Sequence, residues 1–145
     1  MKKKKNTKDF DEIKTYAGFI ALIGVPNSGK STFINRILGQ KIAIVSPKVQ
    51  TTRKKIIGII NFNSSQLVFV DIPGIIQPKG NLNFSMMEIA WSSIKESDLN
   101  LLLIDGSKNA ERIIDENKLI LDSLGSKIKR TILVINKIDK LKKNK

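Results

Sequence analysis

Short runs rich in hydrophobic residues recur along the chain, separated by polar segments. Runs of this length, bounded by turn-forming residues, are typical of buried strands. The five candidate strands cover residues 19–23, 54–62, 66–72, 99–104 and 131–135. The second and third are joined by Asn63-Ser64-Ser65, which predicts a hairpin.

Three other segments carry apolar residues at helical spacing. They are residues 30–38, 84–96 and 110–124. Gly39 and Gly125 follow the first and the third, at positions where a glycine commonly ends a helix. Strands that alternate with helices predict an α/β fold, in which helices cover both faces of a mostly parallel sheet.

The remaining segments are polar and predict the domain organisation. Residues 1–15 are rich in lysine and are expected to form a basic leader, and residues 40–53 and 75–83 are typical of loops. A chain of 145 residues, 41% of them hydrophobic, has enough apolar surface for one domain, which we place at residues 16–145.

The composition excludes several kinds of site. The chain has no cysteine and no histidine, which rules out disulfides, thiolate zinc sites, cysteine nucleophiles and histidine general bases. No apolar run approaches the roughly 20 residues of a transmembrane helix, and no apolar signal segment follows the basic start. We therefore expect a cytoplasmic protein.

Positive charge is concentrated towards the two ends of the chain. The formal net charge is +13, to which residues 1–14 contribute +3 and residues 127–145 contribute +7. Basic tails of this kind bind RNA, DNA or an anionic membrane surface. The alternative is a coding bias, because Lys, Ile and Asn make up 58 of the 145 residues, as an AT-rich genome would produce.

A glycine-rich motif separates the first predicted strand from the first predicted helix. The segment Gly24-Val25-Pro26-Asn27-Ser28-Gly29-Lys30-Ser31, followed by Thr32, fits the pattern G-x-x-x-x-G-K-[ST]. In such a loop, backbone N–H groups point at one anion, the lysine neutralises the outer phosphates and the final hydroxyl binds Mg²⁺. The alternative is a plain glycine turn between a strand and a helix.

A second motif ends the hairpin. Asp71-Ile72-Pro73-Gly74 fits D-x-x-G, in which the aspartate holds Mg²⁺ and the glycine N–H meets the terminal phosphate. The pattern alone is weak, because Asp122-Ser123-Leu124-Gly125 also fits it. The position of the first copy, one hairpin after the glycine-rich motif, favours that copy.

A third motif follows the last predicted strand. Asn136-Lys137-Ile138-Asp139 fits N-K-x-D. A carboxylate in this motif accepts hydrogen bonds from both N1–H and the 2-amino group of guanine, a pair of donors that adenine lacks. The carboxyl end of a strand is also where doubly wound sheets bind their ligands.

A threonine pair completes the set. Thr51-Thr52-Arg53 lies in the predicted loop after the first helix, where a threonine can close over Mg²⁺ when a terminal phosphate is bound. The order of the four motifs predicts a domain that binds a guanine nucleotide, GTP or GDP, together with Mg²⁺.

These residues resemble the Era family of bacterial GTPases. The resemblance extends from about residue 17 to residue 140. It rests on residues 24–32, Gln50-Thr51-Thr52-Arg53, Asp71-Ile72-Pro73-Gly74-Ile75 with Pro78-Lys79, and residues 136–139. It implies a P-loop NTPase fold of the Ras-like G-domain type, GTPase activity, and nucleotide contacts from residues 24–32, 71–75 and 136–139. The metal ligands that it implies are Ser31, Thr52 and Asp71.

The resemblance also implies how hydrolysis is assisted. Ile75 stands where Ras-like proteins have a glutamine that orients water, and Asn27 matches an asparagine that helps to hold K⁺ against the nucleotide. The implied catalytic residues are Lys30, Thr52 and Asn27. We expect slow intrinsic hydrolysis that an ion or a partner stimulates.

Members of the Era family continue beyond this point with a Ser-Ala motif, a further strand and helix, and a KH domain that contacts RNA. We therefore expect residues 16–145 to be a truncated G domain. The binding of 16S rRNA, the assembly of the 30S subunit and some association with the inner membrane are implied for a longer parent. We further expect a monomer of marginal stability and weakened GTP affinity, in which the strand ending at Asn136 forms an exposed edge and one face of the sheet is uncovered.

Two other interpretations remain open. One is a non-catalytic remnant of a split or decaying gene, favoured by the lysine-rich residues 140–145. The other is a module that associates with RNA through its basic ends. Calorimetry with GDP tests the nucleotide site directly, because GDP needs the phosphate loop and the base motif but no catalytic machinery.

Overall fold

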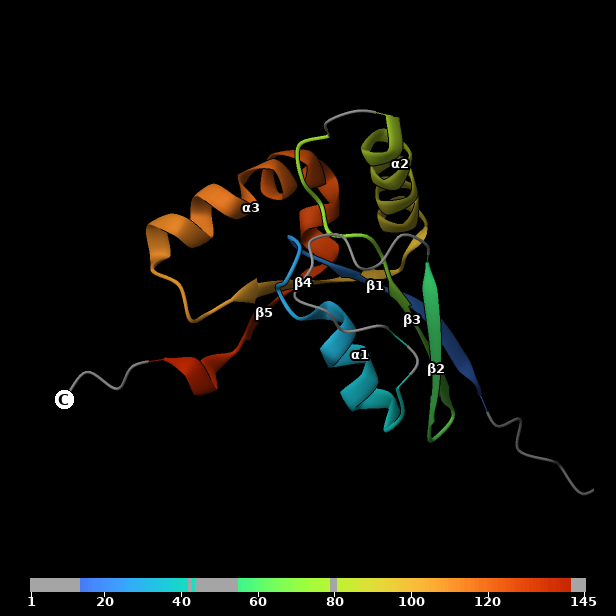
Figure 1. Cartoon of the computed structure of the whole chain (residues 1–145). Helices are drawn as coiled ribbons and strands as arrows, with labels where there is room; N and C mark the ends of the chain where they lie inside the picture. Colours follow the sequence, from blue (N-terminus) through green and yellow to red (C-terminus); the bar gives the residue numbers. More distant parts are fainter. Residues whose placement is uncertain (1–13, 42, 44–54, 79–80, 142–145) are drawn as a thin grey trace, which may run out of the picture.

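The computed structural model describes residues 14–41, 43, 55–78 and 81–141, and a five-stranded sheet lies at its centre (Figure 1). The strands are β1 (Tyr16–Ile23), β2 (Ile56–Phe62), β3 (Ser65–Asp71), β4 (Leu99–Asp105) and β5 (Thr131–Asn136). Their order in the sheet is β2-β3-β1-β4-β5, and among these strands only the pairing of β2 with β3 is antiparallel. The predicted hairpin and the mostly parallel sheet are confirmed.

The register of the parallel strands brings their carboxyl ends to one edge of the sheet. Leu22 lies opposite Asp71, and Asp105 lies opposite Asn136. The segments that follow these strands therefore meet on the same side of the molecule, although they are far apart in the sequence.

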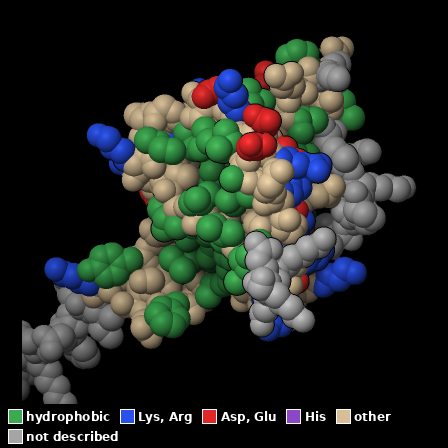
Figure 2. Space-filling model, turned by 90° about the vertical axis from the view of Figure 1, so that its left-hand side faces the viewer, with side chains coloured by type: hydrophobic (Ala, Val, Ile, Leu, Met, Phe, Trp, Pro, Cys, Tyr) green, Lys and Arg blue, Asp and Glu red, His purple; other side chains and the backbone are tan. Residues whose placement is uncertain are grey.

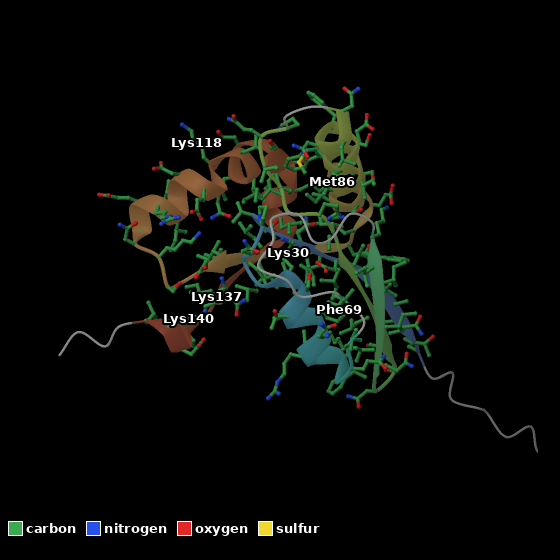
Figure 3. All side chains as sticks on the ribbon, viewed as in Figure 1. Lys30, Phe69, Met86, Lys118, Lys137 and Lys140 are labelled. Atoms are coloured by element: carbon green, nitrogen blue, oxygen red, sulfur yellow. The ribbon has the colours of Figure 1, made fainter. Side chains whose placement is uncertain are left out.

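Helices cover both faces of the sheet, as predicted (Figure 1). Helix α1 (Lys30–Leu38) lies on one face, where Ile34 packs with Phe69 in a buried cluster. Helices α2 (Asn81–Glu96) and α3 (Ala110–Leu124) lie on the other face, where Met86 and Ile120 belong to a second cluster. Phe69 and Met86 mark the two cores in Figure 3.

Some boundaries differ from the prediction. Helix α2 begins at Asn81, three residues before the predicted start; Leu82 in this first turn is 59% exposed, so no apolar stripe marks it. Strand β1 begins at Tyr16, because Tyr16 pairs with Ser65 before the apolar run starts. An unpredicted 3₁₀ helix, η1 (Gly125–Arg130), connects α3 to β5.

Strand β5 forms an edge of the described sheet, as expected. Its side chains Ile132, Leu133 and Ile135 are 51%, 55% and 56% exposed. Successive residues of a strand point to opposite faces, so hydrophobic groups are uncovered on both faces of β5 instead of the single face expected. Figure 2, which views the β5 side of the molecule, shows hydrophobic side chains gathered in a broad patch. None of the described helices is long and apolar enough to cross a membrane.

Candidate nucleotide-binding site

The glycine-rich motif forms a loop between β1 and α1. The loop is closed by two backbone hydrogen bonds, from Ser28 N to the Val25 carbonyl at 3.3 Å and from Ile75 N to the Gly24 carbonyl at 3.1 Å. Gly29 precedes α1 with a φ of +102°, and a Cβ at this position would overlap the side-chain amide of Asn136. Glycine therefore fits position 29 for two reasons: it adopts a positive φ without strain, and it has no Cβ that would clash with Asn136.

Lys30 lies inside this loop. Its Nζ donates at 3.1 Å to the carbonyls of Gly24 and of Val25, and the residue is 6% exposed. Burial lowers the pKa of Lys30 to about 8, while the charge of Asp71 acts to raise it. The loop thus holds a cation among its backbone groups, at the N-terminus of a helix, which is an arrangement suited to an anion.

The D-x-x-G motif lies directly against this loop. Asp71 is fully buried, and its Oδ2 accepts a hydrogen bond from Ser31 Oγ at 2.7 Å. A Cβ at Gly74 would lie 2.6 Å from Pro26 N, so only glycine permits this approach. Ile75 is 1% exposed and belongs to the core below α2 and α3.

The N-K-x-D motif contacts the loop from the β5 side. Asn136 Nδ2 donates to the Ser28 carbonyl at 2.9 Å, and Lys137 Nζ donates to the Asn27 carbonyl at 2.6 Å. The motif continues into the 3₁₀ helix η2 (Ile138–Lys140), in which Asp139 is exposed. Figure 3 shows Lys30 and Lys137 near each other at the ends of the strands.

The structure therefore brings three of the four predicted motifs together. Residues 24–32, 71–75 and 136–139 meet at the carboxyl ends of β1, β3 and β5. The threonine loop, Gln50-Thr51-Thr52-Arg53, and Lys79 lie outside the described residues. Pro78 is described and precedes α2.

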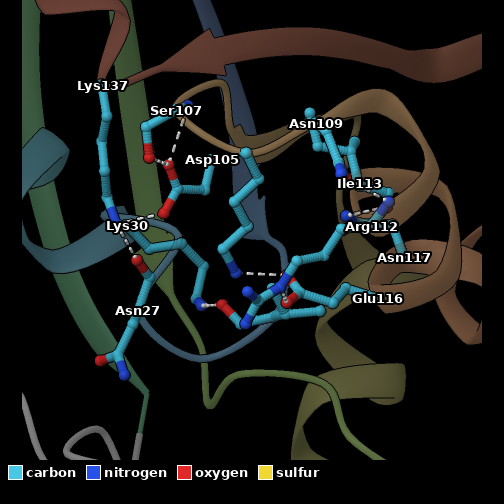
Figure 4. Close-up of polar contacts among 12 residues, drawn as sticks. Asn27, Lys30, Asp105, Ser107, Asn109, Arg112, Ile113, Glu116, Asn117 and Lys137 are labelled. Atoms are coloured by element: carbon cyan, nitrogen blue, oxygen red, sulfur yellow. Dashed lines mark hydrogen bonds and ion pairs between the residues drawn. The ribbon is translucent and has the colours of Figure 1, made fainter. Parts of the chain in front are cut away.

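Asp105, at the end of β4, is part of this assembly and was not predicted (Figure 4). Its Oδ2 lies 2.7 Å from Lys137 Nζ, and its Oδ1 accepts hydrogen bonds from the N–H and hydroxyl of Ser107. Burial acts to raise the pKa of Asp105, but the hydrogen bonds from Lys137 and Ser107 outweigh it and hold the pKa at about 2. The signal that could have indicated this residue is a carboxylate that ends a buried strand at the same sheet edge.

A cleft of about 700 Å³ lies between the phosphate loop and α3. Its walls include Asn27 of the loop, Ile76 after the D-x-x-G motif, and Leu119 of α3. Lys108 and Glu116, which also line it, form an ion pair (Figure 4). The hydrogen bond from Lys108 lowers the pKa of the Glu116 carboxyl.

This architecture and the gathered motifs define the class of the protein, which is a P-loop GTPase domain with a Ras-like fold. Comparison with protein families identifies a narrower group within this class. The family described as 50S ribosome-binding GTPase matches residues 19–137, and the chain belongs to that family.

Individual relatives agree with the resemblance predicted from the motifs. The chain is 44% identical over 128 residues to GTPase Era of Mesorhizobium japonicum, covering 88% of this chain and 40% of that relative. It is 48% identical over 120 residues to GTPase Era of Rickettsia akari, covering 83% of this chain and 40% of the relative. The chain thus spans about 40% of the length of these two relatives.

A solved structure is also similar. It is the crystal structure of Era in complex with MgGDPNP and nucleotides 1506–1542 of 16S ribosomal RNA. The TM-score is 0.78 and the identity is 39%, over 88% of this chain and 42% of that chain. The similarity to the Era family and the Ras-like fold that it implied are confirmed.

Proposed function

We propose that this chain binds guanine nucleotides together with Mg²⁺ and hydrolyses GTP to GDP and phosphate. The observation that carries the proposal is the direct contact between the phosphate loop and the base motif, through Asn136 and Lys137. A single nucleotide can reach both, because its phosphates and its base are joined by one ribose. Membership of a GTPase family supports the same conclusion.

The phosphate chain is proposed to lie in the loop formed by residues 24–29. Backbone N–H groups and the N-terminus of α1 supply partial positive charge, and Lys30 neutralises the outer phosphates. Thr32, in the first turn of α1, and the Gly74 N–H complete the contacts to phosphate oxygens. Val25, Pro26, Ile72 and Pro73 contribute backbone and shape to this pocket.

The donor set beside Lys30 fits Mg²⁺. Ser31 Oγ and Asp71 Oδ2 are hard oxygen donors held 2.7 Å apart, and Asp71 is fully buried. These two residues, with Thr52, would hold the ion together with phosphate oxygens and water. The chemistry that Mg²⁺ supplies when bound is neutralisation of the charge that grows on the phosphate oxygens during transfer.

Asp139 is proposed to read the base. It lies in η2 directly after Asn136 and Lys137, which anchor this segment to the phosphate loop. Its carboxylate would accept hydrogen bonds from guanine N1–H and the 2-amino group. Ile138, which is 63% exposed, is available to pack against the ring.

Replacing Asp139 tests the proposed base contact. Asp139→Asn is expected to weaken GDP binding roughly a hundredfold, about 3 kcal/mol for the loss of charged hydrogen bonds. The same variant should bind xanthosine diphosphate more tightly than the unmodified chain does, because an amide can donate to the 2-oxo group of xanthine. Isothermal titration calorimetry with GDP, ADP and xanthosine diphosphate measures both changes.

The matched control for that experiment is Asp122→Asn on α3. Asp122 belongs to the second D-x-x-G pattern, which the structure places in a helix that ends at Leu124. Its substitution should leave all three affinities within about twofold. Equal affinity of the unmodified chain for GDP and ADP would contradict the proposed function.

Hydrolysis is proposed to depend on an added cation. Ile75 is buried in the core and has no polar side-chain atom, so it cannot orient the attacking water. Asn27 lies in the phosphate loop with a φ of +63°, and we propose that its side chain helps to hold K⁺ against the nucleotide. Lys30 and Thr52 would stabilise the charge that develops on the transferring phosphoryl group.

A comparison of K⁺ with Na⁺ tests this role. Single-turnover GTP hydrolysis is expected to be about tenfold faster in K⁺, which corresponds to about 1.4 kcal/mol of transition-state stabilisation. Asn27→Ala should remove the difference and leave the slower rate. Equal rates of the unmodified chain in the two salts would remove Asn27 from the mechanism.

For a longer protein that contains this domain, we propose binding to 16S rRNA near its 3′ end and a role in assembly of the 30S subunit. The solved complex of Era with nucleotides 1506–1542 of 16S ribosomal RNA supports this role. Filter binding of that RNA segment over a range of salt concentrations tests it, because each phosphate contact steepens the salt dependence.

A further inference from the structure

The carboxylate of Asp105 is held at the end of β4 by three hydrogen bonds (Figure 4). Ser107 donates to Oδ1 through its N–H at 3.1 Å and its hydroxyl at 2.6 Å, and Lys137 Nζ donates to Oδ2 at 2.7 Å. Asp105 is 8% exposed, so water competes little for its carboxylate. Charge-assisted hydrogen bonds in such surroundings are stronger than neutral ones.

Lys137 links Asp105 to the phosphate loop, because it contacts both. The same Nζ atom donates to the Asn27 carbonyl at 2.6 Å, and the neighbouring Asn136 side chain donates to the Ser28 carbonyl at 2.9 Å. Two consecutive carbonyls of the loop are therefore held from the β5 side.

The direction of these carbonyls sets the direction of the N–H groups that follow them. Across a planar trans peptide the C=O and the N–H point in opposite directions. Because the Asn27 carbonyl faces Lys137, the Ser28 N–H points to the other side, where it donates to the Val25 carbonyl at an N···O distance of 3.3 Å and so closes the loop. Loops that bind anions act by aiming N–H groups at one point, so a loop held in one closed shape is preset for this task.

A lysine side chain would not keep this position without a partner. Its four-carbon stem has many rotamers, and ordering it in one of them costs conformational entropy. The Lys137 side chain is 24% exposed, so burial alone does not hold it in place. The ion pair with Asp105 favours the rotamer that reaches Asn27.

We propose that Asp105 is a positioning residue for nucleotide binding: it holds Lys137 against the Asn27 carbonyl and so presets the N–H groups of the phosphate loop. This inference rests on the proposed function of the loop. It assigns Asp105 no contact with the nucleotide, and it joins the end of β4 to the phosphate and base motifs.

The first test replaces the carboxylate by an amide of the same shape. Asp105→Asn is expected to weaken the binding of GDP and of GTP by about tenfold each and to speed GDP release, because the ion pair is lost. Asp98→Asn is the matched control, since Asp98 Oδ2 also accepts a hydrogen bond, from Phe19 N at 2.8 Å, but lies at the opposite end of β4. Its affinities should stay within about twofold of the unmodified chain. An unchanged affinity for Asp105→Asn would overturn the inference.

A double-mutant cycle tests whether Asp105 acts through Lys137. Lys137→Met removes the contact from the other side. If Asp105 acts only by holding this lysine, then the double variant binds GDP as weakly as Lys137→Met alone, within about twofold. Losses that multiply would show two independent effects and would overturn the inference.

The third measurement does not depend on nucleotide binding. The ¹H–¹⁵N resonance of the Ser28 amide is expected to move in nucleotide-free Asp105→Asn and in Lys137→Met, and to stay in place in Asp98→Asn. A Ser28 resonance that does not move in either variant would overturn the inference. If the unmodified chain binds no GDP, the proposed function fails, and this resonance still decides whether Asp105 orders the loop.

Thermal melting of each variant without nucleotide identifies a general loss of folding. Should Asp105→Asn fail to fold, Asp105→Glu keeps the charge while moving it by one methylene, and it is the variant to use. The inference predicts a smaller loss of GDP affinity for Asp105→Glu than for Lys137→Met, and an equal or larger loss would overturn it.

Discussion

At the scale of single residues, the phosphate loop depends on one buried cation. Lys30 Nζ lies 3.1 Å from two backbone carbonyls, and the residue is 6% exposed. Burial lowers the pKa of Lys30, the charge of Asp71 offsets part of that shift, and the pKa is left at about 8. A diphosphate placed in the loop would favour the charged form and would raise the pKa towards its usual value.

Proton uptake on binding follows from this shift. At pH 8, GDP binding is expected to take up about half a proton, since half of Lys30 is then neutral and becomes charged in the complex. The contribution of Lys30 to the uptake should fall towards zero near pH 6, where Lys30 is already charged, and affinity should fall as the pH rises above 8. Calorimetry in buffers of different ionisation enthalpy measures the uptake.

Lys30→Arg is the control for that measurement, because arginine stays charged throughout this range. Any residual GDP binding by this variant should show no proton uptake. An observed enthalpy that is independent of the buffer at pH 8 in the unmodified chain would contradict the prediction.

Residues of the site differed in how far the sequence could predict them. The glycine-rich loop occupies consecutive positions, so one pattern identifies all of its members. Asp105 has no such pattern: its partner Lys137 is 32 positions away, and only the pairing of β4 with β5 brings the two together. Pairings across a sheet depend on strand order, which the motifs do not contain.

At the scale of elements, the beginnings of two helices show different designs. Helix α3 begins with Asn109, whose Oδ1 accepts a hydrogen bond from Arg112 N at 3.0 Å, and Glu111 lies in its first turn. Helix α1 follows Gly29, which makes no side-chain cap, and it has no acidic residue in its first turn. Helix α1 therefore presents the N–H groups of its first turn and the positive end of its dipole to an anion, whereas the Asn109 side chain accepts a hydrogen bond from the first turn of α3.

The cap of α3 can be tested separately from nucleotide binding. Asn109→Ala is expected to lower the free energy of unfolding by about 1 kcal/mol, because one N–H of the first turn loses its acceptor. GDP affinity should not change, since Asn109 does not contact the phosphate loop in the described structure. Urea denaturation measures the first effect and calorimetry the second.

Asn109→Asp serves as the control in that series, because aspartate accepts the same hydrogen bond and suits the positive end of the helix. Its stability should match that of the unmodified chain. Equal destabilisation by the two substitutions would show that the cap is not the cause.

Element boundaries were predictable where local signals marked both ends. Helices α1 and α3 begin and end at the predicted residues, 30–38 and 110–124, because glycines follow both and the periodicity is strong. The start of α2 was wrong by three residues, since its first turn is exposed and polar apart from Leu82. Pairing with β3 extends β1 to Tyr16, and no local signal at this position could indicate that contact.

At the scale of the whole molecule, the two edges of the described sheet differ. Strand β2 exposes Ile57 and Ile59 on one face, whereas on the other face Gly58 is buried and only Phe62, at the end next to the hairpin turn, is a large exposed hydrophobic residue. Strand β5 exposes Ile132 on one face and Leu133 and Ile135 on the other. An edge with free backbone groups and apolar side chains on both faces is a template for pairing with another strand.

The exposed β5 edge predicts that the chain, expected to be a monomer when dilute, self-associates as its concentration rises. Leu133→Lys places a charge in the middle of this edge and is expected to lower the association constant about tenfold or more, because a strand that pairs there would bury the charge. Leu82→Lys is the matched control: Leu82 is 59% exposed, but it lies on α2, which packs against β1 in the middle of the sheet. Sedimentation velocity over a range of concentrations compares the three proteins. Each substitution adds one positive charge to a chain that already carries +13. If both lower the association constant equally, the added charge is the cause, and the β5 edge is not the contact.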